Sequence, residues 1–194
     1  MIIGITGGSG CGKSTALSAI TALGGAVLDC DAIYHRLLET DKNLLEAIEQ
    51  RFPGTVTSGC LDRKGLGALV FSDPAALQAL NEITHEAVKQ EVLRLLPKEG
   101  LAAIEAIGLF ESGLSDLCHI TVAITAPDQL RIARLMAREN IPAEYARLRL
   151  SAQRPQEEFI SLCDYHLEND GTEEAFRQKC LAFFNSRDII KEKN

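Results

Sequence analysis

The sequence has no long apolar run and no excess of basic residues, and each absence argues against a class of protein. No stretch approaches the roughly 20 apolar residues of a membrane-spanning helix, and the N-terminal MIIGIT lacks the basic region of a secretory signal. The formal net charge of −7 disfavours a nucleic-acid backbone as the main partner, because such binding depends on basic patches. We therefore predict a soluble, cytoplasmic protein that binds neither membranes nor nucleic acid.

Paired-cysteine motifs are also missing. The six cysteines are scattered, with no C-x-x-C and no Cys/His ligand spacing. In a cytoplasmic protein such cysteines are expected to be reduced thiols, and no zinc site is predicted.

Short apolar segments alternate with helical patterns along most of the chain. The segments typical of buried strands are 2–6, 26–29, 101–107, 120–125 and 164–169. The helical patterns begin at Lys13 and near Ala32 and cover 41–51, 61–71, 74–96, 128–139, 142–152, 155–162 and 172–189. This alternation predicts one domain of 194 residues with a three-layer α/β/α fold, in which helices cover both faces of a five-stranded parallel sheet. Disorder is expected only at the polar tail KEKN.

Residues 41–96 interrupt the alternation with a mostly helical stretch between two strands. A minimal β-α-β unit joins its strands with a single helix. We therefore predict an inserted helical subdomain, the place where a small-molecule enzyme often binds its second substrate.

The segment GITGGSGCGKST, residues 4–15, carries the strongest chemical signal. It contains G-x-x-x-x-G-K-S/T, the P-loop pattern, between a predicted strand and a predicted helix. Glycines allow successive N–H groups to surround a phosphate at a helix N-terminus. Lys13 is expected to reach the β- and γ-phosphates of ATP, and the Ser14 hydroxyl to ligate Mg²⁺. The predicted nucleotide-binding residues of the loop are Gly8, Gly10, Cys11, Gly12, Lys13, Ser14 and Thr15.

Cys11 occupies a loop position where only the backbone is needed, so its side chain is expected to be incidental. A thiol at a helix N-terminus can nevertheless be acidified. We therefore also consider the hypothesis that oxidation of Cys11 blocks the phosphate site.

Two aspartates, Asp29 and Asp31, follow the second predicted strand at the sheet edge where α/β folds bind ligands. Asp31 could do no more than cap the helix that begins near Ala32. The alternative is a catalytic Asp31 that accepts the proton of an acceptor hydroxyl near Mg²⁺, because phosphoryl transfer needs a group that orients the nucleophile. We predict the catalytic role.

Arg131, Arg134 and Arg138 recur at i, i+3 and i+7 and so share one helical face. Such a face is either merely solvated or part of a mobile lid, residues 131–160, that closes arginines over a triphosphate. The P-loop upstream favours the lid, with Arg138 as the catalytic and ATP-binding arginine.

The rest of the sequence limits which P-loop protein this is. The guanine-reading N-K-x-D of switch GTPases is missing. Motor and transporter ATPases usually have a longer apolar strand that ends in a metal-binding aspartate, whereas here the strand at 101–107 leads into GLFESGL, where Glu111 is the only acidic candidate for that role. A small-metabolite kinase fits best. The alternatives are a kinase for another metabolite or a nucleoside monophosphate, and a regulator that senses nucleotide without transferring phosphate.

Seven segments together resemble the dephospho-coenzyme A kinase family in order and spacing. They are TGGSGCGKST, LDCDAIYHRL, LDRKGLGALVF, NEITHEAV, IGLFESGL, RLMAREN and YHLENDG, and they span nearly the whole chain. The resemblance implies transfer of the γ-phosphate of ATP to the 3′-hydroxyl of dephospho-coenzyme A, with coenzyme A bound by the subdomain at 41–96.

By matching positions, the resemblance also implies roles for individual residues. It makes Asp31 catalytic, places Arg63 and His85 on the substrate side, assigns the lid arginine to Arg138 and sets Asn169 beside the adenine. From the residues alone, Arg63 fits a helix-surface cation and His85 a structural histidine equally well.

The sequence departs from the family in four places. Glu86 and IGLFE stand where the family usually has prolines, LEN replaces IDN, and Arg154 replaces a common methionine.

Overall fold

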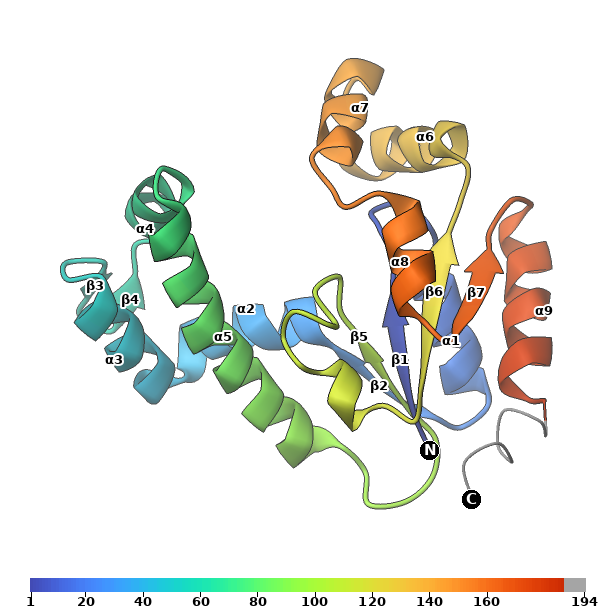
Figure 1. Ribbon diagram of the computed structural model, residues 1–194, viewed down its shortest axis with the longest axis horizontal. Coiled ribbons are helices and arrows are strands. Elements are labelled where there is room, and N and C mark those ends of the chain that lie inside the picture. The colour runs from blue at the N-terminus through green and yellow to red at the C-terminus, as the bar shows by residue number, and fades with distance from the viewer. Residues whose placement is uncertain (187–194) are drawn as a thin grey trace.

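The computed structural model describes residues 1–186 and is built around a five-stranded parallel sheet (Figure 1). The end of the predicted helix 172–189 and the KEKN tail therefore lie outside the described residues. The strands are β1 (Ile2–Thr6), β2 (Ala26–Asp29), β5 (Ala102–Glu105), β6 (Ile120–Thr125) and β7 (Tyr165–Glu168). Their order is β2-β5-β1-β6-β7, and every neighbouring pair is parallel. This confirms the predicted α/β fold.

Both faces of the sheet are buried, which explains why its strands are continuous apolar runs. Ile3 and Ile5 of β1 point into a core formed with α1 (Lys13–Ala22) and α9 (Glu173–Phe184). Ile104 of β5 points to the opposite face, into a second core that includes α2 (Cys30–Thr40) and α5 (Pro74–Leu95). The two cores lie on either side of the sheet.

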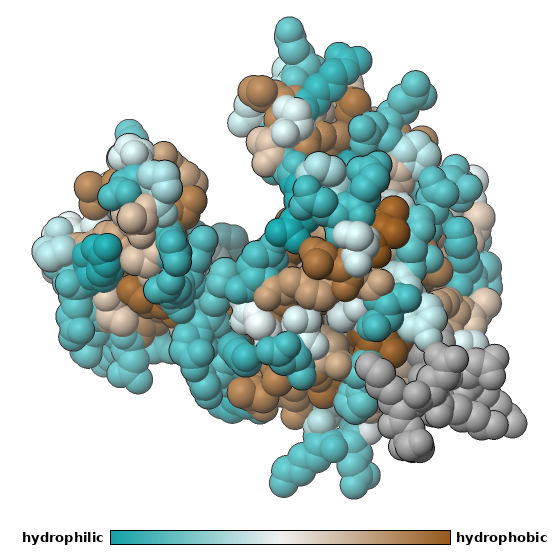
Figure 2. Space-filling view, viewed as in Figure 1, coloured by the Kyte–Doolittle hydropathy of each residue, from teal (hydrophilic) through white to brown (hydrophobic). Residues whose placement is uncertain are grey.

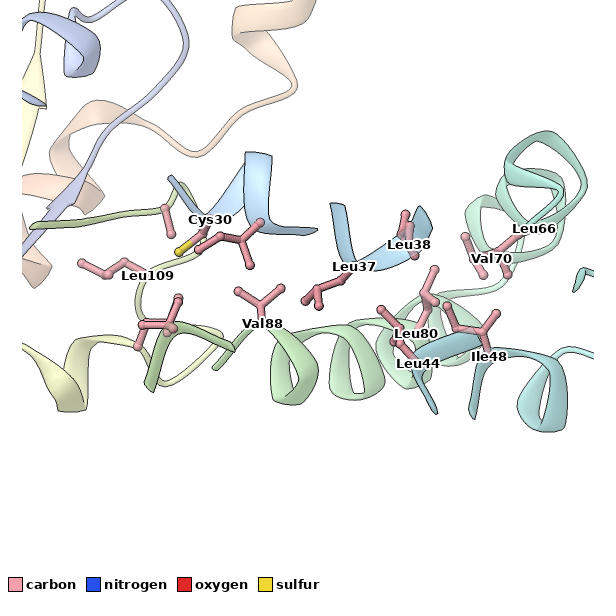
Figure 3. Close-up of a cluster of buried hydrophobic side chains, with 14 of the residues drawn as sticks. Cys30, Leu37, Leu38, Leu44, Ile48, Leu66, Val70, Leu80, Val88 and Leu109 are labelled. Atoms are coloured by element: carbon pink, nitrogen blue, oxygen red, sulfur yellow. The ribbon is translucent and has the colours of Figure 1, made fainter. Parts of the chain in front are cut away.

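The second core continues away from the sheet into a helical arm, made of α2, α3 (Lys42–Arg51), α4 (Arg63–Phe71) and α5. Figure 3 shows a file of apolar side chains that runs from Leu109 and Cys30 beside the sheet, past Leu37 and Val88, to Leu66 in α4. The apolar faces of these helices therefore form the interior of the arm and also pack the arm against the sheet.

The helix predicted over 61–71 is present as α4 but starts two residues later, at Arg63. A hairpin of β3 (Val56–Thr57) and β4 (Cys60–Leu61), which was not predicted, precedes it and includes Leu61. Asp62 sets the start of α4, because its carboxylate accepts hydrogen bonds from the N–H groups of Lys64 and Gly65.

A second helical unit follows β6. It contains α6 (Asp128–Glu139), α7 (Ala143–Ser151) and α8 (Gln156–Leu162), and α6 packs against α7 beyond the carboxyl ends of the strands (Figure 1). A short 3₁₀ turn, η1 (Ser115–Leu117), precedes β6. A bilayer would need a longer or more apolar helix than any in residues 1–186.

Candidate active site

The glycine loop joins β1 to α1 at the carboxyl edge of the sheet. Gly12 precedes α1 in the left-handed region, with φ 98°. Gly7 has φ 143°, and a Cβ there would lie 2.1 Å from the carbonyl oxygen of Ile124. The turn therefore requires glycine at both positions.

Side chains from outside the loop hold three of its consecutive carbonyl groups. The bonds run from Arg131 Nε to Ser9 O (3.0 Å), from Arg134 Nη1 to Gly10 O (3.1 Å) and from Asn169 Nδ2 to Cys11 O (2.9 Å). Because the C=O and N–H of one planar peptide unit point in opposite directions, the amides that follow these carbonyls turn toward the other side of the loop. That side forms the cradle of N–H donors that phosphate oxygens need.

Lys13 lies folded over the loop. Its Nζ donates to Gly7 O at 2.8 Å and stands 3.4 Å from a carboxylate oxygen of Glu105, the last residue of β5. Burial raises the pKa of the Glu105 carboxyl, nearby Asp29 and Asp31 raise it further, and Lys13 opposes the rise. A buried acid is thus poised beside the lysine of the phosphate loop.

Glu105 was missed at the sequence level, where Glu111 was taken as the only acidic candidate after this strand. The structure corrects that choice: the strand ends at Glu105, and Glu111 pairs with Arg154. The sequence did contain a signal for Glu105: it is an acidic residue at the end of the apolar strand segment AAIE, where an acid is unexpected unless it has a partner. The ion pair also shows what Arg154 contacts, and its guanidinium lies over the Phe159 ring as well.

A cavity of about 650 Å³ opens in front of the loop. It collects most of the predicted nucleotide-binding and catalytic residues, namely Gly8, Gly10, Gly12, Lys13, Ser14, Thr15, Asp31, Arg138 and Asn169. It also includes Asp29, Glu105 and Arg134, which were not among the predicted site residues. The cavity joins the lysine of the loop to four carboxylates, those of Asp29, Asp31, Glu105 and Glu173. This is the charge pattern of a site for a phosphate with a divalent cation.

Cys11 does not belong to that lining. Its side chain is fully buried in the core between the sheet and α1, and burial raises the pKa of its thiol. The suggested acidification by the helix N-terminus is therefore wrong, because loss of water around the thiolate outweighs the charge of Lys13. The buried thiol also gives no support to the oxidation hypothesis.

The two aspartates have separate positions. Asp29 caps α2, since its Oδ1 accepts the N–H of Ala32 at 2.9 Å. Helix α2 begins at Cys30, two residues earlier than expected, so Asp31 lies in the first turn and is not the cap. The purely structural alternative for Asp31 is thereby removed.

A second cavity, of about 220 Å³, lies between α2, α5 and the segment after β5. Asp31 and Ile107 line both cavities, so the two cavities meet at these residues. His85 and Tyr34 line the second one, and burial raises the pKa of the Tyr34 hydroxyl, opposed by the charge of Arg63. In Figure 2 the surface is deeply notched between the arm and the sheet domain.

Arg63 stands apart from the other predicted residues. Its guanidinium is half exposed and lies 3.4 Å from a carboxylate oxygen of Glu39. Among the described residues that line either cavity, Arg63 is not found. The structure therefore brings His85 to Asp31 but leaves Arg63 at the surface of the arm.

The arginines of α6 divide into three roles. Arg131 is 5% exposed and bonds to Asp128 and to the loop, which makes it a support. Arg134 lines the larger cavity and donates to Asn169 Oδ1 at 3.1 Å. Arg138 lines the same cavity but is 62% exposed and pairs with Glu139. The sequence spacing correctly placed the three arginines on one helical face. It did not show that Arg131 supports the loop while Arg134 and Arg138 line the cavity.

Comparisons with known proteins agree on one family. The family model of dephospho-CoA kinase matches residues 1–174. A dephospho-CoA kinase of Thermus thermophilus is 39% identical over 174 residues, which cover 89% of this chain and 84% of that protein.

Solved structures are similar over most of the chain. A Thermus thermophilus protein superposes with a TM-score of 0.79 at 37% identity, over 95% of this chain and 96% of that one. A dephospho-CoA kinase from Campylobacter jejuni matches with a TM-score of 0.66 at 29% identity, over 94% of each chain.

Proposed function

The chain belongs to the dephospho-CoA kinase family, and on that premise we propose that it transfers the γ-phosphate of ATP to the 3′-hydroxyl of dephospho-CoA, giving CoA and ADP. The observation that carries this proposal is the meeting of two cavities at Asp31. One cavity has the phosphate-binding loop, and the other lies against the helical arm. An in-line transfer between two bound substrates needs this arrangement.

On the donor side, ATP would place its phosphates against the loop amides and Lys13. The lysine now bonds to Gly7 O, so binding would exchange that contact for phosphate oxygens. Arg134 and Arg138 would offset charge on the transferred group, with residues 131–160 acting as a lid that excludes water. Asn169, which holds Cys11 O and Arg134, would support the loop from the adenine side.

On the acceptor side, Asp31 would accept the proton of the 3′-hydroxyl as that oxygen attacks the γ-phosphorus. His85 and Tyr34 line the cavity in which the ribose end of dephospho-CoA would lie. Arg63, at the surface of the arm, would reach more distant phosphates of the substrate.

The residues of the donor cavity fit Mg²⁺. The Ser14 hydroxyl and the carboxylates of Asp29, Asp31 and Glu105 all line it, and oxygen ligands are those that Mg²⁺ prefers. Over residues 1–186 no group of three or more His, Cys, Asp or Glu forms a metal cage. This suits an ion that is usually held by one or two protein groups and substrate phosphates. When bound, it would neutralise charge on the phosphates.

The remaining parts of the proposal concern partners and compartment. Both substrates are small molecules, and the reaction would take place in the cytoplasm. The support is chemical: all six cysteines are free thiols, which persist in a reducing compartment.

A panel of acceptors tests the reaction. ADP release is measured with dephospho-CoA, AMP, CMP, uridine and shikimate, and phosphorus NMR locates the new phosphate. We expect turnover with dephospho-CoA and a phosphate on its 3′-oxygen. Preference for another acceptor, or ATP binding without turnover as in a nucleotide sensor, would overturn the proposal.

A further inference from the structure

Ser9, at the apex of the phosphate loop, is bonded through all of its polar groups to residues of the proposed lid. Its N–H donates to Gln153 Oε1 at 2.9 Å, and its Oγ accepts from Gln153 Nε2 at 2.6 Å. Its carbonyl accepts from Arg131 Nε at 3.0 Å. We call these three residues the Ser9 clamp.

Gln153 lies between α7 and α8, where the chain returns from the lid to the sheet. Its Oε1 also accepts from Arg131 Nη2 at 3.2 Å, so the amide oxygen faces two donors and the amide nitrogen faces a hydroxyl. This pattern orients the side-chain amide in one way only. Arg131 is itself held, by Asp128 Oδ1 at 2.9 Å, so the clamp has a rigid base.

The loop and the clamp are also in steric contact. A Cβ on Gly8 would lie 2.4 Å from Arg131 Nη2 and 3.0 Å from Gln153 Oε1. Gly8 does not adopt a left-handed conformation, so backbone geometry alone does not demand glycine there. A side chain at this position would therefore displace the Arg131 guanidinium or the Gln153 amide.

We propose that Gln153 is a positioning residue for ATP: through Ser9 it holds the loop apex in its phosphate-binding shape and ties that shape to the position of the lid. Gln153 holds the N–H and Oγ of Ser9, and Arg131, which Gln153 also contacts, holds the Ser9 carbonyl. That carbonyl shares its peptide unit with the Gly10 amide of the phosphate cradle. Since the coupling is reciprocal, a loop filled with phosphate favours the lid position in which Gln153 reaches Ser9. The proposal rests on ATP as the donor in the proposed function.

Replacement of Gln153 by methionine tests the clamp, because methionine keeps the length but not the hydrogen bonds. Gln156→Met is the matched control: Gln156 accepts from the N–H of Ala126 at 3.0 Å and donates to Asp128 Oδ1 at 3.4 Å, so it shares the Asp128 contact of Arg131 but does not bond to the loop. Kinetics are measured for both substrates, and ATP binding is measured by calorimetry without an acceptor, so the result stands even if dephospho-CoA is not the acceptor.

We expect Gln153→Met to raise the Kd and KM of ATP about tenfold, as loss of its two hydrogen bonds to Ser9 implies, with the KM of dephospho-CoA unchanged. Gln156→Met should retain the ATP constants of the parent. Equal ATP constants in the two variants, or a parallel rise in both KM values, would overturn the proposal.

A double-mutant cycle with Ser9→Ala separates coupling from general damage. Ser9→Ala removes only the Oγ contact and should raise the ATP Kd by less than Gln153→Met does. The double variant should bind ATP no more weakly than Gln153→Met, because both changes break the same contact. Additive losses contradict the clamp. If Gln153→Met fails to fold, Ser9→Ala decides alone, and an unchanged ATP Kd rejects the proposal.

Discussion

At the scale of single residues, Asp31 and Asp29 present the same charge to the donor cavity but differ in position. Asp29 caps α2, whereas Asp31 also lines the acceptor cavity. This difference favours the proposed role of Asp31 in proton transfer, because a purely electrostatic role would belong to both aspartates.

Asp31→Asn should bind ATP as the parent does and lower kcat about 10²- to 10⁴-fold, the usual contribution of a general base. Asp29→Asn is the matched control, because it removes the same charge from the cavity and asparagine caps helices as well as aspartate. Steady-state kinetics and ATP titration check both variants. Equal losses in the two variants, or unchanged turnover in Asp31→Asn, would remove the base assignment.

The buried carboxylate of Glu105 is predicted to lower the free energy of unfolding at neutral pH. Its pKa is raised by burial, so between the unfolded and folded pKa values the native state binds more protons than the unfolded state. The stability contribution of this group is therefore complete below 4.5, the ordinary pKa of a glutamate, and is lost as pH rises through the pKa of the folded state.

Glu105→Gln should accordingly be more stable than the parent at pH 7 and nearly equal to it at pH 4. Its activity should fall about 10- to 100-fold, because a supporting partner of Lys13, the proposed catalytic lysine, is lost. Urea unfolding at the two pH values and kinetic assays provide the measurements. A variant that is less stable at pH 7 than at pH 4, relative to the parent, would contradict the pKa direction.

At the scale of elements, the helical arm depends on its own apolar file. Ile48 of α3 is fully buried there, while Ile3 of β1 is equally buried in the core on the other face of the sheet. The same substitution at these two positions therefore tests the arm and the sheet separately.

Ile48→Ala should lower the free energy of unfolding by about 2 to 5 kcal/mol. Its main effect should be faster amide hydrogen exchange in α3, α4 and α5, and a higher KM for dephospho-CoA. Ile3→Ala should instead speed exchange in the sheet and α1. Identical exchange patterns in both variants would mean that the arm has no local stability of its own.

Elements also mark the limit of sequence-based prediction. Strands and long helices were predictable, because apolar runs and helical periodicity are local patterns. The β3–β4 hairpin was not, because its two-residue strands depend on Glu49, whose carboxylate accepts the N–H groups of Gly54 and Val56. The end of β5 was misplaced because Ala106 and Ile107 continue its apolar pattern.

In the candidate site, too, local sequence patterns were predictable and long-range contacts were not. The phosphate loop is a contiguous motif, so its residues were predictable from the sequence. The position of Asp31 at the sheet edge was predictable because it directly follows a strand pattern. The contacts of Arg134 and Gln153 with the loop join residues more than 100 positions apart in the chain. No spacing rule reveals which face of α6 meets the loop, so these supports required the structure.

At the scale of the whole molecule, the cysteines report on the native state. Cys60 is exposed, Cys118 and Cys163 are partly exposed, and Cys30 and Cys180 are buried. Burial raises the thiol pKa to about 12 in Cys30, Cys118 and Cys180 and to about 11 in Cys163. Cys11 is buried too, and the pKa of its thiol is also raised.

The native protein should therefore react with an aromatic disulfide reagent at one thiol, Cys60, within the time in which the unfolded chain reacts at six. Mass spectrometry of the labelled protein gives the count and the position. Cys60→Ser should abolish the fast phase while leaving kinase activity at the parent level. Rapid labelling of Cys11 would show that the loop opens to solvent.

The sheet separates two apolar cores, one behind the phosphate loop and one beneath the acceptor cavity and the arm. Substitutions can thus accumulate in the arm without disturbing the packing that shapes the ATP side. A kinase built in this way can change its acceptor during evolution while the machinery for its donor is inherited intact.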